Sequence, residues 1–438
     1  MKLTQNTVYN LLGLGAPLLA AVPAIPLLIG ALGTDRFGLL ALMWAIVNYL
    51  SLFDLGLGRA LTQRLAAIRG QDGQESPAVL VLNALTLLGA MGSLAGLMLL
   101  ALAYWGRQQF PTVTGPDEFM GAAYALAAAM PTITITSGLR GVLEAEHAFA
   151  TVNLLRLPMG LFGFLGPLAV ALVYPDRLDL IAWILAAGRF LTMMAHACCI
   201  WLQSSVPLGR AQLDLTLMSR LIRAGGWLSF SNLISAVLGY VDRFIIGAIV
   251  SPTAISHYAV PHELVTKLWV MPTALTSAMY PAIAEASDPG RRVIGRLLTR
   301  AILGILVVML PICGAGITWA YPLLEWWINA EFARHSSVPL QILLAGMLLS
   351  SLAMVPFTYL QGRALFRLTA AIHAVELPVF MVAIYIMTRQ FGVTGAAMAW
   401  TLRAAADGAL MYFFCRRALA RTPAEPASLA VSESPRIL

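Results

Sequence analysis

Long apolar runs are the feature that most constrains this sequence. Crossing a bilayer as a helix takes about 20 residues, and twelve segments are apolar and long enough. They lie at residues 8–32, 38–57, 78–104, 118–139, 153–174, 179–203, 226–250, 254–284, 297–320, 337–361, 369–388 and 393–414. In hydrocarbon the backbone must satisfy its own hydrogen bonds, so such segments span as helices. We predict an all-α polytopic membrane protein with about 12 transmembrane helices.

Composition supports this class. Only 11 % of residues are charged, whereas a soluble domain carries about 25 %. The links between apolar runs are too short for a sizeable soluble domain. The first run lacks a clear small-residue cleavage site, so we interpret it as a retained span. The four cysteines, Cys198, Cys199, Cys313 and Cys415, show no metal-ligand spacing and suit apolar packing.

The distribution of Lys and Arg predicts the topology. With the N-terminus in the cytoplasm, 18 basic residues fall in cytoplasmic segments and 5 on the opposite side, while the remaining five lie within spans. Cytoplasmic loops of membrane proteins carry the excess of Lys and Arg. This asymmetry predicts that both termini are cytoplasmic. The basic residues are scattered over membrane-flanking loops, which argues against nucleic-acid binding.

A short internal sequence repeat divides the chain into two halves. Leu28-Ile29-Gly30-Ala31-Leu32 returns as Ile245-Ile246-Gly247-Ala248-Ile249, at an offset of 217 residues. Halves of six spans each keep the same orientation, so the pseudo-twofold repeat is parallel, with its axis along the membrane normal. We predict an N-lobe at 1–210, a C-lobe at 211–420 and a disordered cytoplasmic tail at 421–438. A substrate site is expected between the lobes.

Charged residues inside the spans are the candidate functional groups, because intramembrane charge is costly and rarely accidental. The bases are Arg156, Arg189, Arg243, Lys267 and Arg403, and the acids are Asp242, Glu263, Glu376 and Asp407. Asp54 ends the second span, where it serves either as a gate contact or as a structural helix-end partner.

Spacing sorts the bases by available partners. Glu263 and Lys267 are four residues apart, as are Arg403 and Asp407, so each pair shares a helix face. These pairs either neutralise each other or act on a ligand. Arg189 has no acid within a turn of its own helix. The acid beside Arg243 is its direct neighbour, which points about 100° away on a helix. Arg156 lies near the end of its span, where it can snorkel to the headgroups.

Several motifs resemble one family of membrane proteins. GALGTDRFGLLALMWAIVNYLSLFDLGLGRALTQRLA, at 30–66, looks like the region of the first two spans in bacterial polysaccharide flippases of the Wzx type. YVDRFIIG, at 240–247, looks like the start of their second half. NAEFARHSSVPLQILLAG, at 329–346, and FGVTGAAMAW, at 391–400, look like the entries of their tenth and twelfth spans. The resemblance covers nearly the whole chain, and it places the sequence in the multidrug/oligosaccharidyl-lipid/polysaccharide exporter superfamily.

The resemblance implies two six-helix lobes around a central V-shaped cavity that opens to alternate sides. It also implies a substrate, an undecaprenyl-diphosphate-linked oligosaccharide carried from the cytoplasmic to the periplasmic leaflet of the bacterial inner membrane. The function is then cell-surface polysaccharide biosynthesis, beside polymerases and glycosyltransferases. Sister families leave two alternatives open, a cation-coupled multidrug exporter and a flippase for the peptidoglycan precursor.

A membrane-bound glycan polymerase or ligase is an alternative of another class. Such an enzyme needs an acid, base or nucleophile presented at the membrane surface. The sequence has no HExxH motif, no paired-carboxylate loop motif and no large outer loop to hold a glycan. These features favour transport over catalysis.

For this substrate, the residue types suggest roles. Arg holds diphosphate well, because its planar fork donates two parallel hydrogen bonds. Arg189 and Arg243 are the first candidates for diphosphate, and Lys267 and Arg403 extend this set. The alternative for the two arginines is an ion pair with an acid on another span. Coupling to H⁺ or Na⁺, or gating, is assigned to the acids Asp54, Asp242, Glu263, Glu376 and Asp407. We expect no metal site and no other cofactor.

Overall fold

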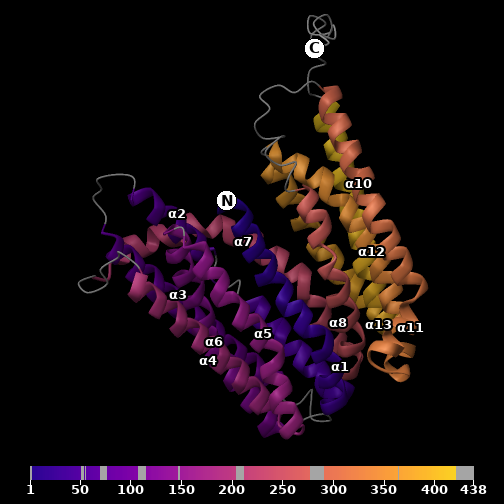
Figure 1. Ribbon diagram of the computed structural model, residues 1–438, viewed down its shortest axis with the longest axis horizontal. Helices are drawn as coiled ribbons and strands as arrows, with labels where there is room; N and C mark the ends of the chain where they lie inside the picture. The colour runs from indigo at the N-terminus through magenta and orange to yellow at the C-terminus, as the bar shows by residue number, and fades with distance from the viewer. Residues whose placement is uncertain are drawn as a thin grey trace, which may run out of the picture. The chain divides into compact units, whose positions relative to one another are not determined.

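The computed structural model describes residues 2–50, 54, 56–69, 76–106, 115–146, 148–203, 212–276, 291–363 and 365–420. Within these ranges every regular element is a helix (Figure 1). The helices are α1 (Lys2–Leu50), α2 (Leu57–Arg69), α3 (Pro77–Gly106), α4 (Pro116–Ala145), α5 (Phe149–Val173), α6 (Leu178–Gln203), α7 (Leu215–Ile249), α8 (Pro252–Lys267), α10 (Arg291–Thr318), α11 (Ala320–Trp327), α12 (Ala330–Gly362) and α13 (Phe366–Ala420).

These helices confirm the predicted fold class, because each of the twelve predicted spans overlaps a described helix. Eight described helices are long and apolar enough to cross a membrane, and two of these, α1 and α13, each contain two predicted spans. α7 and α8 cover the seventh span and the beginning of the eighth. The end of the eighth span and the predicted tail at 421–438 lie outside the described residues.

Two glycines divide the two longest helices. The backbone leaves helical geometry at Gly33, with φ 75°, and at Gly392, with φ 58°. Glycine has no Cβ, so it adopts positive φ without steric cost. In α13 the chain turns back on itself, because His373 and Asp407 lie on opposite sides of Gly392 and their side chains approach to 3.6 Å. Gly392 therefore marks the turn between the eleventh and twelfth spans.

The described contacts group the chain into two compact units, residues 1–256 and 257–438. In the first unit α4 packs against α3 and α6, and α1 packs against α5, while α7 contacts α1, α2 and α3. In the second unit α12 packs against α10, α11 and α13. The predicted lobe boundary at residue 210 came from the repeat and stays a prediction.

Small residues let α3 and α4 approach closely. Gly92 and Gly96 are four apart on α3, and a Cβ added at Gly96 would lie 2.6 Å from the carbonyl oxygen of Ala127. This is the small-xxx-small arrangement that membrane helices use, because lipid provides no hydrophobic force to press helices together. The neighbouring backbone, not a movable side chain, occupies the space.

We expect Gly96→Ala to reduce the amount of folded protein, because the added methyl group forces α3 away from α4. The expected cost is about 1–3 kcal/mol, as for other overpacked sites. Gly163→Ala is the matched control, since a Cβ at Gly163 meets no atom within 4 Å. The measurement is the melting temperature of each purified variant in detergent. Equal melting temperatures for both variants would contradict the close packing of α3 and α4.

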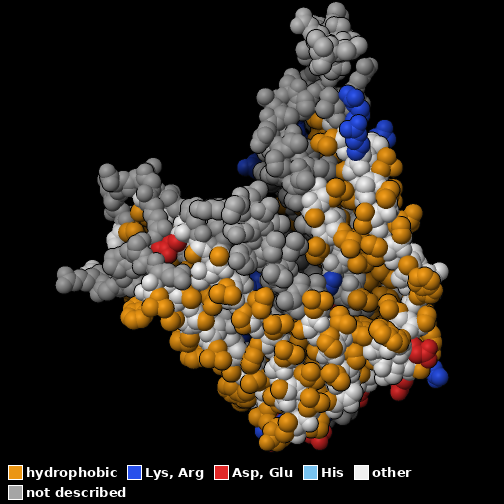
Figure 2. Space-filling model, in the orientation of Figure 1, with side chains coloured by type: hydrophobic (Ala, Val, Ile, Leu, Met, Phe, Trp, Pro, Cys, Tyr) orange, Lys and Arg blue, Asp and Glu red, His pale blue; other side chains and the backbone are white. Residues whose placement is uncertain are grey.

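The described surface is mostly apolar, as expected for helices that contact lipid. Hydrophobic side chains cover most of the described surface in Figure 2, with few charged ones among them. Large apolar side chains such as Leu19, Leu154 and Val307 are more than 70 % exposed. Exposed apolar faces on spanning helices contact lipid chains and need no further partner.

Candidate functional site in the buried charges

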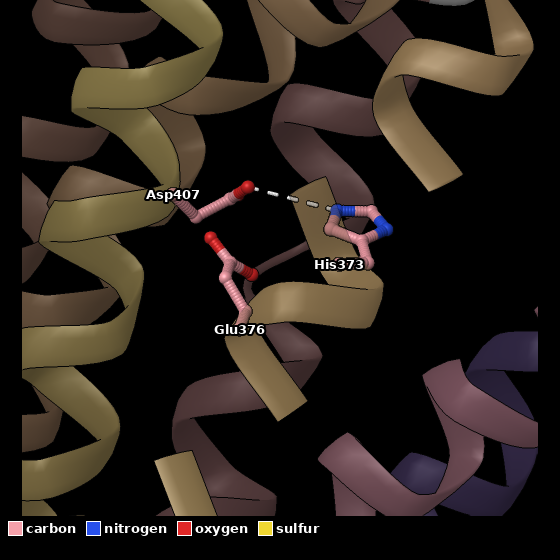
Figure 3. Close-up of side chains that lie close together, drawn as sticks. All are labelled: His373, Glu376 and Asp407. Atoms are coloured by element: carbon pink, nitrogen blue, oxygen red, sulfur yellow. Dashed lines mark ion pairs between the residues drawn. The ribbon is translucent and has the colours of Figure 1, made fainter. Parts of the chain in front are cut away.

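A cluster of ionisable side chains lies across the turn of α13 (Figure 3). His373 and Glu376 come from the helix before Gly392, and Asp407 comes from the helix after it. Their ligand atoms all lie within 4.8 Å of one another. His373 Nε2 lies 3.6 Å from Asp407 Oδ1, and the His373 ring stacks on Phe357. One histidine and two carboxylates thus share a small space inside the second unit.

Glu376 is the most confined member of this cluster. Its side chain is 7 % exposed, and neither carboxylate oxygen has a hydrogen-bond partner among the described residues. His373 lies three positions earlier and on the same helix face. A buried carboxylate without partners is costly, so this group is poised to take up a proton or a cation.

Of the two alternatives for Arg403 and Asp407, the described structure does not show the mutual ion pair. Asp407 turns to His373, and no ion pair joins Asp407 to Arg403 in the described part of the chain. The Arg403 guanidinium lies over the Phe380 ring, 5.4 Å from its centroid. An aromatic face attracts a cation through its quadrupole. The spacing allowed the ion pair, but the aromatic ring and the histidine provided competing partners from across the turn.

The other predicted pair forms. Lys267 Nζ lies 3.0 Å from Glu263 Oε2, and both side chains are partly exposed, at 46 % and 34 %. Neighbouring His262 stacks on Tyr258 and meets Trp400 edge-on, so it belongs to an aromatic core. An exposed i,i+4 pair contributes only a few tenths of a kcal/mol, roughly 0.3–0.5. Glu263 and Lys267 are therefore mutually engaged, and neither stands out as a ligand group.

Asp242 and Arg243 are buried in the first unit, at 0 % and 2 % exposure. Asp242 Oδ1 accepts the backbone N–H of Arg243 at 2.8 Å, and the Arg243 guanidinium lies 5.0 Å from the centroid of the Tyr240 ring. Both roles assigned to these residues stay predictions. A side chain as buried as Arg243 reaches a ligand only if the surrounding helices rearrange.

Arg189 has neither the ion pair of Lys267 nor the aromatic contact of Arg243 and Arg403 in the described structure. It lies in the middle of α6 and is partly exposed. Its one polar contact among the described residues is with the sulfur of Met159, at 3.6 Å from Nη1. A thioether is a weak acceptor, so no described group compensates the positive charge. The alternative of an ion pair with an acid on another span is not found for Arg189 in the described structure.

Asp54 links the start of α2 to α4 through hydrogen bonds. Its carboxylate accepts the backbone N–H of Gly56 at 3.0 Å and the hydroxyl of Ser137 on α4. These bonds fix the start of α2 against α4, as the structural interpretation requires. Gating by Asp54 stays a prediction.

We expect Asp54→Ala to lower the melting temperature, because two hydrogen bonds to a charged acceptor are lost. Each such bond contributes about 1.5–3 kcal/mol. Ser137→Ala serves as the paired variant, since it removes one bond and keeps the carboxylate. If Asp54 is a gate contact, the transport rate per molecule falls while the melting temperature is unchanged, and that result would contradict the structural role.

One ion-pair cluster was missed by the sequence reasoning. Arg36 Nη1 lies 2.8 Å from Glu118 Oε1, and the same carboxylate accepts the backbone N–H of Leu178 at 2.6 Å. Nearby, the Asp179 carboxylate bonds to Arg177 and raises the pKa of the Arg177 guanidinium. These groups join the loop after the first span to the starts of α4 and α6. Their sequence signal is weak, because the partners are 82 and 60 residues apart.

The fold is shared with solved structures of membrane transporters. An inward-facing multidrug resistance MATE family transporter of the MOP superfamily superposes with a TM-score of 0.74 over 97 % of this chain and 99 % of that one, at 14 % identity. The lipid II flippase MurJ in an inward closed conformation gives a TM-score of 0.66 over 94 % and 87 % of the two chains, at 11 % identity. The chain has the fold of these transporters.

Sequence comparison defines the family. The family model described as "Polysaccharide biosynthesis protein" matches residues 3–287, and the chain belongs to this family. The "Putative O-antigen transporter" of Shigella flexneri is 26 % identical over 419 residues, which cover 95 % of this chain and 98 % of that protein. The resemblance inferred from the motifs is thereby confirmed.

Proposed function

We propose that this protein is a flippase for a lipid-linked oligosaccharide in the bacterial cytoplasmic membrane. Its family is that of polysaccharide biosynthesis proteins, and its relative in Shigella flexneri is described as an O-antigen transporter. The fold is that of membrane transporters, among them a lipid II flippase. The protein is a multi-pass transporter and not an enzyme. Its cargo is an undecaprenyl-diphosphate-linked oligosaccharide, moved from the cytoplasmic to the periplasmic leaflet by alternating access.

The observation that carries the substrate assignment is the charge of Arg189, which has no acid partner among the described residues. An intramembrane arginine without an acid partner is costly, and a diphosphate is the anion that its planar fork fits best. In the low dielectric of a closed site, this attraction is far stronger than in water. Arg189 thus holds the diphosphate. Arg243, Lys267 and Arg403 contribute only in states where their present contacts are released.

The cluster of His373, Glu376 and Asp407 supplies the coupling. Two carboxylates and a histidine can exchange H⁺, and the carboxylates can ligate Na⁺. Occupation by a cation removes the cost of the buried charge and stabilises the helix hairpin of α13. Release of the cation reverses this effect. The cluster therefore links an ion gradient to a conformational preference of the second unit.

A cation-coupled drug exporter remains the competing transporter function, because the same acidic cluster can attract an organic cation. Arg189 argues against that cargo, since a fixed positive charge repels cationic drugs. The flippase also works beside a polysaccharide polymerase and glycosyltransferases, which make and consume its cargo.

The test is a deletion strain with the gene supplied on a plasmid. We expect loss of the gene to remove surface polysaccharide and to accumulate undecaprenyl-diphosphate-linked repeat units. The extracted lipid-linked sugars identify the glycan. Normal surface polymer together with new sensitivity to cationic dyes would overturn the proposal and favour drug export.

A further inference from the structure

The first unit contains an apolar cavity of about 570 Å³ that neither the diphosphate site nor the coupling cluster uses. Five helices line it, through residues 39–46 on α1, 99–105 on α3, 118–126 on α4, Leu178 at the start of α6 and 244–248 on α7. On α4 the lining residues Phe119, Ala122, Ala123 and Leu126 follow helical spacing. The lining segments thus point into one shared space.

The lining is suited to hydrocarbon and not to a charged group. Glu118 is the one ionisable residue in the lining, and Arg36 and the N–H of Leu178 already bind its carboxylate. Folded interiors rarely leave voids larger than a water molecule. A dry apolar cavity of about 150 Å³ already binds small apolar molecules, and this one is several times larger. Its occupant is an uncharged apolar chain.

The cavity opens toward lipid. Leu102 and Trp105 on its rim are 63 % and 81 % exposed, and Phe244 is 37 % exposed. These side chains continue the lipid-facing surface of the spanning helices. All lining segments lie at the helix ends that the predicted topology places on the periplasmic side. An occupant therefore enters sideways from the outer leaflet.

We propose that this cavity binds the isoprenoid chain of the lipid-linked cargo at the periplasmic end of transport. This inference rests on the proposed function for the identity of the lipid. The volume of about 570 Å³ is roughly four times the 150 Å³ of an apolar cavity that binds benzene, so it has room for several isoprene units. The lining includes the small residues Ala103, Ala122, Ala123 and Ala248 among larger side chains. The methyl branches of an isoprenoid chain fit beside these small residues, whereas a straight acyl chain has no branches to place there.

The experiment is photo-crosslinking of the full chain in lipid nanodiscs. One probe is a polyprenyl diphosphate with a diazirine in its chain, and the other is phosphatidylglycerol with a diazirine in its acyl chain. We expect the polyprenyl probe to label peptides that contain residues 39–46 or 118–126. The yield should fall at least tenfold in Ala122→Phe and Ala248→Phe, which fill the cavity. Ala248 is exposed at the cavity edge, so this variant keeps the fold even if Ala122→Phe does not.

Ala128→Phe is the matched control, because Ala128 lies on the same helix as Ala122 but is exposed and outside the lining. It should keep full labelling. The inference is overturned if Ala248→Phe labels like the unmodified chain, or if phosphatidylglycerol labels the same peptides at an equal yield. Labelling that persists in a chain shown not to export polysaccharide would refute the proposed function alone. Normal export without labelling would refute this inference alone.

Discussion

Arg189→Ala should reduce polysaccharide export by roughly 100- to 1000-fold while leaving the amount of protein in the membrane unchanged. Its guanidinium is partly exposed, and in the described structure it has no acid partner and, unlike that of Arg403, no aromatic ring beneath it. Two charge-assisted bonds to a diphosphate contribute about 3–4 kcal/mol together, and each 1.4 kcal/mol corresponds to a factor of about ten. The contact with the Met159 sulfur is weak, so its loss does not destabilise the fold.

The measurement is the rate at which lipid-linked repeat units reach the periplasmic leaflet, normalised to protein abundance. Arg156→Ala is the matched control, since Arg156 is exposed near the N-terminal end of α5, where its side chain can reach the lipid headgroups. Arg189→Lys keeps the charge but not the planar fork, so it should retain an intermediate rate. Normal export by Arg189→Ala would show that the diphosphate is held elsewhere.

Arg243 provides a contrasting case. The same substitution there removes a side chain that is 2 % exposed and stacks on Tyr240. A loss of export in Arg243→Ala could result from misfolding or from weaker ligand binding, and the export assay would not distinguish the two. Arg189 is therefore the cleaner position, although the sequence alone ranked the two together.

The sequence was sufficient for the fold class because bilayer thickness and backbone hydrogen bonding leave few choices. Twelve apolar runs had to be helices, because backbone groups in hydrocarbon must bond within the chain. The Glu263–Lys267 pair also followed from spacing, since both members share one helix face. These features are local, and local rules predict them.

Contacts between helices could not be predicted in the same way. Asp407 was four residues from Arg403, yet its partner is His373 from the preceding span. Glu118 was passed over, because Arg36 and Leu178 are distant in sequence and near only after folding. The apolar cavity had no sequence signal, since its lining residues look like ordinary lipid-facing ones. Packing decides which of many possible partners meet.

Glu376→Gln should abolish the response of transport to an ion gradient. The substitution keeps the shape of the side chain but removes its ability to ionise, and among the described residues Glu376 has no hydrogen-bond partner that the change would break. In proteoliposomes we expect lipid-linked oligosaccharide transport by the unmodified chain to rise when either a pH gradient or a Na⁺ gradient is imposed alone, and the responding gradient identifies the ion. The variant should lose at least 90 % of that rise, and Asp407→Asn should behave alike because it removes a charge from the same cluster.

Glu263→Gln is the matched control, since Glu263 is partly exposed and bound to Lys267 in the same unit. It should respond to the gradient like the unmodified chain. His373→Gln separates the two ions, because a histidine that relays protons is needed for H⁺ coupling and is dispensable for Na⁺ held by carboxylates. A gradient response that survives in Glu376→Gln and Asp407→Asn would move coupling away from α13, and Asp242 would then be the next acid to test.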